Sequence, residues 1–250
     1  MPHAPLRTLR LAAVDIDGVL LNDTFSPVIH RLAVQQGVEY TPELERAVFS
    51  RPRLAAAQAF VQATGSSVSP QDIIDAYFAE RDRYLRTHPV RVLDGALALL
   101  QRLRALGLQI VCYGGLDKSH FDRHLGTWAS YFTGPRYICT NDFRPGIPEI
   151  TRDVFGLPFD QVLFIDDVAT VAEQAKELDV AFIGHPGSYA HGFQRELMQA
   201  VGVRHLVDSL SAIDEELLAC VDREAAEGTS WRRGSDGDAS DTTRKSEVLS

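Results

Sequence analysis

The sequence predicts an α/β protein with a doubly wound, Rossmann-like parallel sheet and an inserted α-helical domain. Short continuous apolar runs of strand length alternate with segments of helical apolar spacing along most of the chain. Strands that are apolar on both faces are typical of parallel sheets, because helices cover both faces of such a sheet. Residues 23–91 contain no such run, but they carry several helix-start signals.

The core elements are expected to alternate regularly along the chain. Strands are expected at residues 9–14, 108–115, 137–140, 161–165, 180–184 and 205–207. A helix is expected to begin at Asp94 and to end at Gly107, directly before the second strand. Further helices are expected at residues 148–155, 171–178 and 188–200. This alternation of strand and helix is typical of a doubly wound sheet.

The insertion begins its helices with a repeated signal. A serine or threonine followed by proline is typical of the N-cap and first helical position, and it occurs at Ser26-Pro27, Thr41-Pro42 and Ser69-Pro70. An apolar stripe follows the third signal at Ile73, Ile74, Tyr77, Phe78 and Tyr84. We interpret this stripe as packing within the insertion and not as a binding surface. Arg51 and Arg53, between two helices of the insertion, are candidates to contact an anionic substrate.

Three segments follow from these patterns. The α/β core is predicted to comprise residues 8–22 and 92–222, and the helical insertion residues 23–91. Residues 223–250 are rich in Gly, Ser, Asp, Thr and mixed charge, with an isolated Trp231. This composition predicts a disordered tail, because it offers too little apolar surface to offset the entropy of ordering.

Two acidic pairs stand where apolar strands end. Asp15 and Asp17 follow the first strand, and alternate residues of a strand project to the same side. Gly18 allows a sharp turn and a close approach of the backbone to a ligand. Asp166 and Asp167 follow a second apolar run, and ligands bind beyond the carboxyl ends of parallel strands. Either pair alone could be a turn or a helix cap, but together they predict a site for Mg²⁺, a cation that prefers oxygen ligands.

With these motifs, residues 8 to about 215 resemble the haloacid dehalogenase (HAD) superfamily of phosphohydrolases. The resemblance implies that Asp15 is the nucleophile, that Asp17 is the general acid/base, and that Asp15, Asp17, Asp166 and Asp167 hold Mg²⁺. Arg144, in Arg144-Pro145-Gly146, stands where the family has a basic residue, usually Lys. The resemblance also implies that the helical insertion is a cap that closes over the site.

The chain departs from the family at the second core strand. A Ser or Thr is expected at the end of that strand, but the sequence there is Cys112-Tyr113-Gly114-Gly115. Tyr113 is nearest to the expected hydroxyl position, and Gly114 and Gly115 are candidates to bind phosphate through backbone N–H groups. Cys112 could suggest a thiol nucleophile, but an inert buried cysteine is the more frequent case.

Composition favours an intracellular enzyme. The 250 residues are 45% hydrophobic, the net charge is −9, and no basic stripe supports nucleic-acid binding. Three widely spaced cysteines fit a reducing compartment, and no secretory signal or membrane-spanning stretch is visible, so a cytoplasmic location is expected. Lys118, His120 and His124 lie near the expected site entrance, and surface positions on a helix are their ordinary interpretation.

The function expected from these features is a Mg²⁺-dependent phosphatase that acts on a small phosphorylated metabolite through an aspartyl-phosphate. One alternative keeps the fold and transfers the phosphoryl group to a sugar, as a phosphomutase does. The other is a catalytically weak binding or accessory protein, which the missing Ser or Thr favours. The sequence leaves the substrate and the oligomeric state open.

Overall fold

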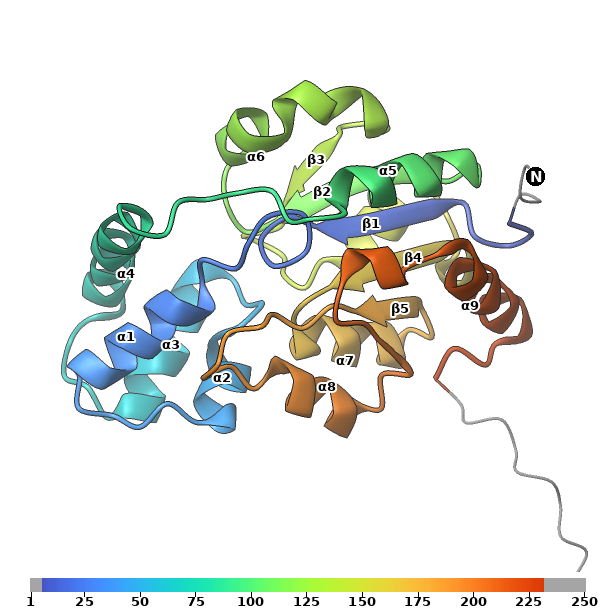
Figure 1. Ribbon diagram of the computed structural model, residues 1–250. Helices are drawn as coiled ribbons and strands as arrows, with labels where there is room; N and C mark the ends of the chain where they lie inside the picture. The colour runs from blue at the N-terminus through green and yellow to red at the C-terminus, as the bar shows by residue number, and fades with distance from the viewer. Residues whose placement is uncertain (1–5, 232–250) are drawn as a thin grey trace, which may run out of the picture.

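The computed structural model describes residues 6–231, which form an α/β core and a group of helices beside it (Figure 1). Six parallel strands form one sheet in the order β3-β2-β1-β4-β5-β6. They are β1 (Leu11–Asp15), β2 (Gln109–Gly114), β3 (Tyr137–Cys139), β4 (Val162–Asp166), β5 (Ala181–Gly184) and β6 (His205–Leu206). The predicted doubly wound sheet is therefore confirmed. The first residue of each strand differs from the expected one by at most two positions.

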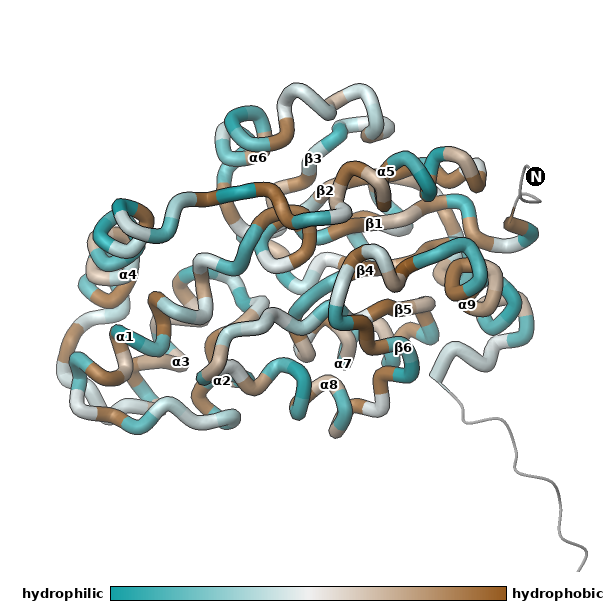
Figure 2. The backbone as a smooth tube through the Cα atoms, viewed as in Figure 1, coloured by the Kyte–Doolittle hydropathy of each residue, from teal (hydrophilic) through white to brown (hydrophobic). Residues whose placement is uncertain are grey.

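Helices cover both faces of the sheet, and each face has its own apolar core. One face packs against α5 (Ala96–Ala105), α6 (Lys118–Leu125) and α9 (Glu215–Glu227). The other face packs against α7 (Ala169–Glu177) and α8 (Gln194–Val201). Hydrophobic residues run along the central strands, whereas the helices alternate in hydropathy, as an amphipathic covering layer requires (Figure 2).

Short helical turns complete the core. They are η1 (Gly126–Tyr131), η2 (Glu149–Val154), η3 (Phe159–Gln161) and η4 (Leu210–Ala212). The helix expected at residues 148–155 is thus present as η2, a single π-helical segment. The helix expected from residue 188 begins only at Gln194, because a turn closed by the bond from the Gly192 N–H to the Tyr189 carbonyl precedes it.

The cap comprises α1 (Ser26–Gln35), α2 (Pro42–Val48), α3 (Arg53–Thr64) and α4 (Pro70–Leu85). Thr41 and Ser69 cap α2 and α4 as expected, each accepting a hydrogen bond from a first-turn N–H. The expected cap at Ser26 is wrong. Asp23 accepts the Phe25 and Ser26 N–H groups at 2.7 and 3.0 Å, so Ser26 already lies inside the helix.

The cap is joined to the core in two places. The two segments that cross between them form an antiparallel bridge at Leu21 and Val92. Farther away, the buried carboxylate of Glu45 on α2 accepts bonds from the Phe193 N–H at 3.0 Å and from Gln194 Nε2 at 2.7 Å. Gln194 in turn accepts the Ala169 N–H at 2.6 Å, at the start of α7.

The predicted start of the disordered tail, residue 223, is wrong. Helix α9 continues to Glu227, and Trp231 is not isolated, since its Nε1 donates to the Val180 carbonyl at 2.8 Å. Its ring also lies 6.1 Å from that of Phe182. Residues 232–250, the rest of the predicted tail, lie outside the described residues. Among the described helices, none has the length and apolar character needed to cross a membrane.

Candidate active site

The site lies beyond the carboxyl ends of β1, β2 and β4. Asp15 is the last residue of β1 and is paired in register with Tyr113 of β2, while Asp166 is the last residue of β4. Asp15, Asp166 and Asp167 are almost fully buried, with exposed fractions of 3%, 0% and 5%. Continuous apolar strands therefore bring acidic side chains from two neighbouring strands to the same edge of the sheet.

Two glycines allow the close approaches within this cluster. Gly18 has a φ of +111°, and a Cβ there would lie 2.0 Å from Asp167 Oδ2, so the carboxylate packs directly against the glycine backbone. A Cβ on Gly115 would lie 2.6 Å from Arg144 Nη1. Gly18 after β1 and Gly115 after β2 thus leave room for Asp167 and Arg144, respectively.

The carboxylates repel one another in this site. Burial and then the charge of Asp166 raise the pKa of Asp15 well above its usual range, although the Arg144 guanidinium, 3.8 Å from Asp15 Oδ1, and a hydrogen bond from the Asp17 backbone lower it. Burial, followed by the charges of Asp166 and Asp15, likewise raises the pKa of Asp167. Asp15 Oδ1 is buried and has no hydrogen-bond partner. Such a cluster is short of positive charge.

This donor set fits a hard divalent cation. Mg²⁺ is bound by carboxylate and carbonyl oxygens, which Asp15, Asp17 and Asp167 offer to the cavity. Asp166 lies behind them, outside the cavity lining, and both of its oxygens accept hydrogen bonds from the protein. Asp15 Oδ1, which is buried without a hydrogen-bond partner, fits such a site because it is free to bind a cation.

Tyr113 is placed differently from what the sequence suggests. Its hydroxyl donates to Asp166 Oδ2, its side chain is fully buried, and its ring packs against Phe164 at 5.5 Å between centroids. It is not among the residues that line the cavity, so the candidate for the expected hydroxyl position points toward Asp166 and not into this space. The phenol instead fixes Asp166, whose second oxygen accepts the Val168 N–H at 2.7 Å.

His120 joins the site from α6. Its Nε2 lies 2.9 Å from Asp17 Oδ1, and its side chain is only 10% exposed. The sequence places this histidine near the entrance but does not show that it reaches Asp17. The signal that could have found it is its distance of only a few residues from Gly114-Gly115, since α6 begins directly after that turn.

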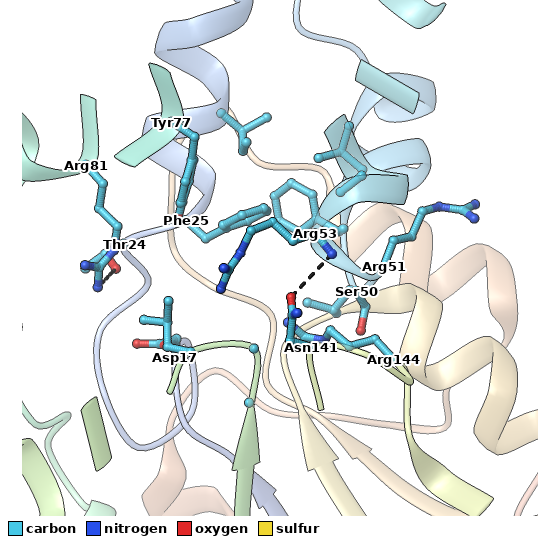
Figure 3. A pocket seen from close by; sticks show the side chains of 18 of the residues that line it. Asp17, Thr24, Phe25, Ser50, Arg51, Arg53, Tyr77, Arg81, Asn141 and Arg144 are labelled. Carbon is cyan, nitrogen blue, oxygen red and sulfur yellow. Dashed lines mark hydrogen bonds between the residues drawn. The ribbon is translucent and has the colours of Figure 1, made fainter. Parts of the chain in front are cut away.

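A cavity of about 140 Å³ connects these groups to the cap. Its core wall contains Asp15, Asp17, Asp167, Gly114, Gly115 and Arg144, so the structure brings most of the predicted site residues around one space. Arg51 and Arg53 also line it, as does Arg81, which the sequence did not single out. Figure 3 shows Asp17 below and the cap side chains Phe25, Tyr77 and Arg53 above.

Solved structures of other proteins share this architecture. A haloacid dehalogenase-like protein of unknown function from Agrobacterium tumefaciens matches over 87% of this chain and 99% of its own, at 20% identity and a TM-score of 0.59. The chain has the haloacid dehalogenase fold. The resemblance inferred from the acid motifs is thereby confirmed at the level of the fold.

Two further structures with this fold carry functional names. A phosphonoacetaldehyde hydrolase-like protein from Oleispira antarctica is 14% identical, with 90% and 97% of the two chains covered and a TM-score of 0.63. CbbY from Rhodobacter sphaeroides, in complex with xylulose-1,5-bisphosphate, is 14% identical over 81% and 95% of the chains, with a TM-score of 0.59. No protein-family model matches the chain, and no curated protein matches it significantly. At these identities the likeness establishes the haloacid dehalogenase fold alone.

Proposed function

We propose that this protein is a Mg²⁺-dependent phosphohydrolase that acts on a small phosphorylated metabolite through an aspartyl-phosphate. The observation that carries the proposal is the Asp15 carboxylate: it is buried, it lines the cavity, and its Oδ1 has no hydrogen-bond partner. A buried carboxylate oxygen without a hydrogen bond is costly for stability, and its placement is understandable if that oxygen reacts there.

The first half-reaction transfers the phosphoryl group to the protein. A carboxylate oxygen of Asp15 attacks phosphorus in line, a new P–O bond forms, and the ester P–O bond breaks. Asp17 gives its proton to the departing alcohol oxygen, so the product leaves neutral. Arg144, with Nη2 3.8 Å from Asp15 Oδ1, is placed to face the charge on the phosphoryl oxygens.

The second half-reaction returns the enzyme to its starting state. Asp17 takes a proton from water, the water oxygen attacks phosphorus, and the aspartyl P–O bond breaks to restore the Asp15 carboxylate and inorganic phosphate. Asp15, Asp17 and Asp167 would hold the metal, with Asp166 behind them, and the metal supplies positive charge against the attacking and phosphoryl oxygens. His120, 2.9 Å from Asp17, holds the acid/base in position.

The phosphate site must do without the hydroxyl that the family places after the second strand. Gly114 and Gly115 both line the cavity, and their backbone N–H groups are the proposed replacement. Arg144 reaches the same turn, because only glycine at position 115 leaves room for its guanidinium. An anion nest and a planar guanidinium together offer the donors that a phosphate requires.

The phosphatase proposal is tested by phosphate release from 4-nitrophenyl phosphate and from acetyl phosphate, with Mg²⁺ and with EDTA. We expect Mg²⁺-dependent release, and Asp15→Asn should lower it by about a thousandfold or more, because the amide cannot form the intermediate. Melting temperatures show that the variant is folded. Full activity in Asp15→Asn, or the absence of any activity in the parent, would overturn the proposal and favour a binding or accessory role.

A phosphomutase remains the alternative with the same first half-reaction. It is favoured by the likeness to CbbY, which is solved with a sugar bisphosphate. Product analysis separates the two, because a mutase returns the phosphoryl group to a sugar while a phosphatase releases it as inorganic phosphate.

A further inference from the structure

The cap wall of the cavity is built from apolar and aromatic side chains. They come from the crossing segment, the four cap helices and the turn after α2, and they are Phe25, Ile29, Val48, Phe49, Phe60, Ile73, Ile74, Tyr77 and Phe78. Phe25 contacts two of the other rings, Phe49 at 4.8 Å and Tyr77 at 5.4 Å between centroids. The stripe on α4 that the sequence assigned to packing inside the cap therefore also lines the cavity.

The size and polarity of this wall limit what it can bind. The whole cavity of about 140 Å³ has to hold the phosphoryl group beside the core acids as well as the leaving group beside the cap, so the leaving group must be small. A leaving group with many hydroxyls needs a partner for each of them. Apart from the arginines and Asp23, the polar side chains of the cap and crossing segment in this wall are Thr24, Ser50 and Tyr77. An aromatic ring fits these surroundings better than a polyhydroxylated chain.

Three cap arginines line the cavity, but Arg51 points away from its centre, which leaves Arg53 and Arg81 beside the apolar wall (Figure 3). Among the described residues, neither Arg53 nor Arg81 forms an ion pair. Arg81 Nε is buried and unpartnered, and its Nη2 has only a long contact of 3.5 Å with Thr24 Oγ1. The Arg53 guanidinium lies 5.0 Å from the centre of the Phe78 ring.

Two other arginines of the cap have an acidic partner. Arg31 and Arg83, which do not line the cavity, pair with the buried carboxylate of Glu80 at 3.3 and 3.0 Å. A buried guanidinium atom without a partner costs stability. In Figure 3, Arg81 lies on the opposite side of the site from Arg144, so the two bases cannot serve the same group.

We propose, on the basis of the phosphatase function above, that the substrate is a phosphate monoester whose leaving group combines an aromatic ring with a second anionic group. The ring lies against Phe25 and Tyr77, and the second anion is bound by Arg53 and Arg81. Guanidinium groups suit this task because they bind carboxylates through two donors and also lie well against aromatic faces.

Four esters of primary alcohols test the two parts of this proposal separately: ethyl phosphate, 2-phosphoglycolate, benzyl phosphate and 4-carboxybenzyl phosphate. All four break the same kind of P–O bond, so differences in kcat/KM report binding of the leaving group. We expect 4-carboxybenzyl phosphate to exceed each of the others by at least tenfold. Equal or higher values for ethyl phosphate or 2-phosphoglycolate would overturn the proposal.

The arginines are tested with Arg81→Met and Arg53→Met. Methionine keeps much of the apolar stem and removes the charge. In either variant, the ratio of kcat/KM for 4-carboxybenzyl over benzyl phosphate should fall at least tenfold. Arg86→Met is the matched control, because Arg86 is an exposed residue at the end of α4 outside the cavity lining, and its ratio should equal that of the parent. An unchanged ratio in both test variants would sink the assignment of the anion site.

A binding measurement separates failure of this inference from failure of the phosphatase proposal. If no ester is hydrolysed, the phosphatase function is overturned, and the cavity is then judged with 4-(hydroxymethyl)benzoate by calorimetry. We expect this product analogue to bind the parent at least tenfold more tightly than Arg81→Met and more tightly than benzyl alcohol binds the parent. Absence of binding, or equal binding by the variant, overturns the inference independently of catalysis.

Discussion

The core wall and the cap wall of the cavity differ in how their charged groups are held. On the core side, the carboxylates lie at the ends of paired strands, and Asp166 is fixed by Tyr113 and by a backbone N–H. On the cap side, Arg53 and Arg81 project from helices into an apolar space with few hydrogen bonds. Both walls contain a buried polar atom without a hydrogen-bond partner, Asp15 Oδ1 in the core and Arg81 Nε in the cap. The difference is that strand ends and charged neighbours fix the core groups, whereas apolar side chains surround the cap arginines.

The largest expected effect on the core wall comes from removing one of its negative charges. Asp167→Asn should stabilise the metal-free protein, because it removes one of the mutually repelling buried carboxylates. Mg²⁺ that binds only the folded parent should stabilise it by about 2.7 kcal/mol at a hundredfold excess over Kd. The variant should lose most of this increase. Thermal melts of both proteins, with EDTA and with Mg²⁺, measure both effects.

The same pair of proteins gives a pH dependence with a defined sign. Because folding raises the pKa of Asp167, its contribution to stability is fully present below the unfolded value of about 3.9 and is lost as pH rises through the folded value. The advantage of metal-free Asp167→Asn over the parent should therefore be large at neutral pH and shrink toward pH 4. A helix-capping Asp predicts little change, since Asn caps equally well, and a constant difference would contradict the metal-site interpretation.

Gly18→Ala tests whether the core wall depends on close backbone contact. A Cβ there would lie 2.0 Å from the Asp167 carboxylate at a φ of +111°, so we expect a loss of about 2 kcal/mol and of the Mg²⁺-dependent stabilisation. Gly37→Ala in the cap is the matched control. Gly37 also has a positive φ, +70°, but nothing lies within 4 Å of a Cβ there, so about 1 kcal/mol and no loss of the Mg²⁺ effect are expected. If both variants lose the same stability and both keep the Mg²⁺ effect, the close contact of Gly18 with Asp167 is not important for the site.

Tyr113→Phe tests the bond that fixes Asp166. The variant keeps the ring packing on Phe164 but leaves a buried carboxylate short of one donor, which should cost about 1.5 kcal/mol in urea unfolding. Tyr137→Phe is the control, because the Tyr137 hydroxyl donates to the neutral Leu116 carbonyl at 2.6 Å, and bonds to neutral acceptors contribute less. A larger loss in the control would show that Asp166 does not depend on this phenol.

The smallest expected effect concerns His120, which positions Asp17. His120→Leu should lower kcat about tenfold and leave KM unchanged, because it affects proton transfer and not binding of the ester. His120→Gln, which can still donate to Asp17, should recover part of the lost rate. Lys118→Met, on the exposed side of α6, should leave both constants unchanged. A change in KM alone would contradict the positioning role.

The sequence predicts the core more completely than the cap for a physical reason. Continuous apolar runs define the parallel strands, and the register of β1 with β4 follows from burying both, so the acidic pairs are found from the chain itself. The direction of the Tyr113 side chain was not found, because it depends on Asp166, which is distant in sequence and lies two strands away in the sheet. The residue pattern within one strand does not show which side chains of other strands lie close to it.

The remaining misses also depend on contacts between distant residues. Trp231 stands in a polar segment, and only its bond to Val180 shows that it is part of the fold. Arg81 has the spacing of an ordinary surface residue on a helix, and its unpartnered Nε becomes visible only when the cavity is assembled. At the start of α1, Asp23 binds the Phe25 and Ser26 N–H groups, whereas the sequence predicts Ser26 as the cap. Asp and Ser are equally favoured at helix starts, so the sequence alone does not distinguish them.

The contact of Glu45 with the core has a consequence for how the cap opens. Glu45 binds Gln194, and Gln194 binds the N–H of Ala169, two residues after Asp167. Lifting α2 from α8 would leave both the buried carboxylate and the buried amide short of partners, so the closed arrangement is favoured by their desolvation cost. Any movement of α2 away from α8 would therefore be coupled to the segment that carries Asp166 and Asp167, because Gln194 binds both elements.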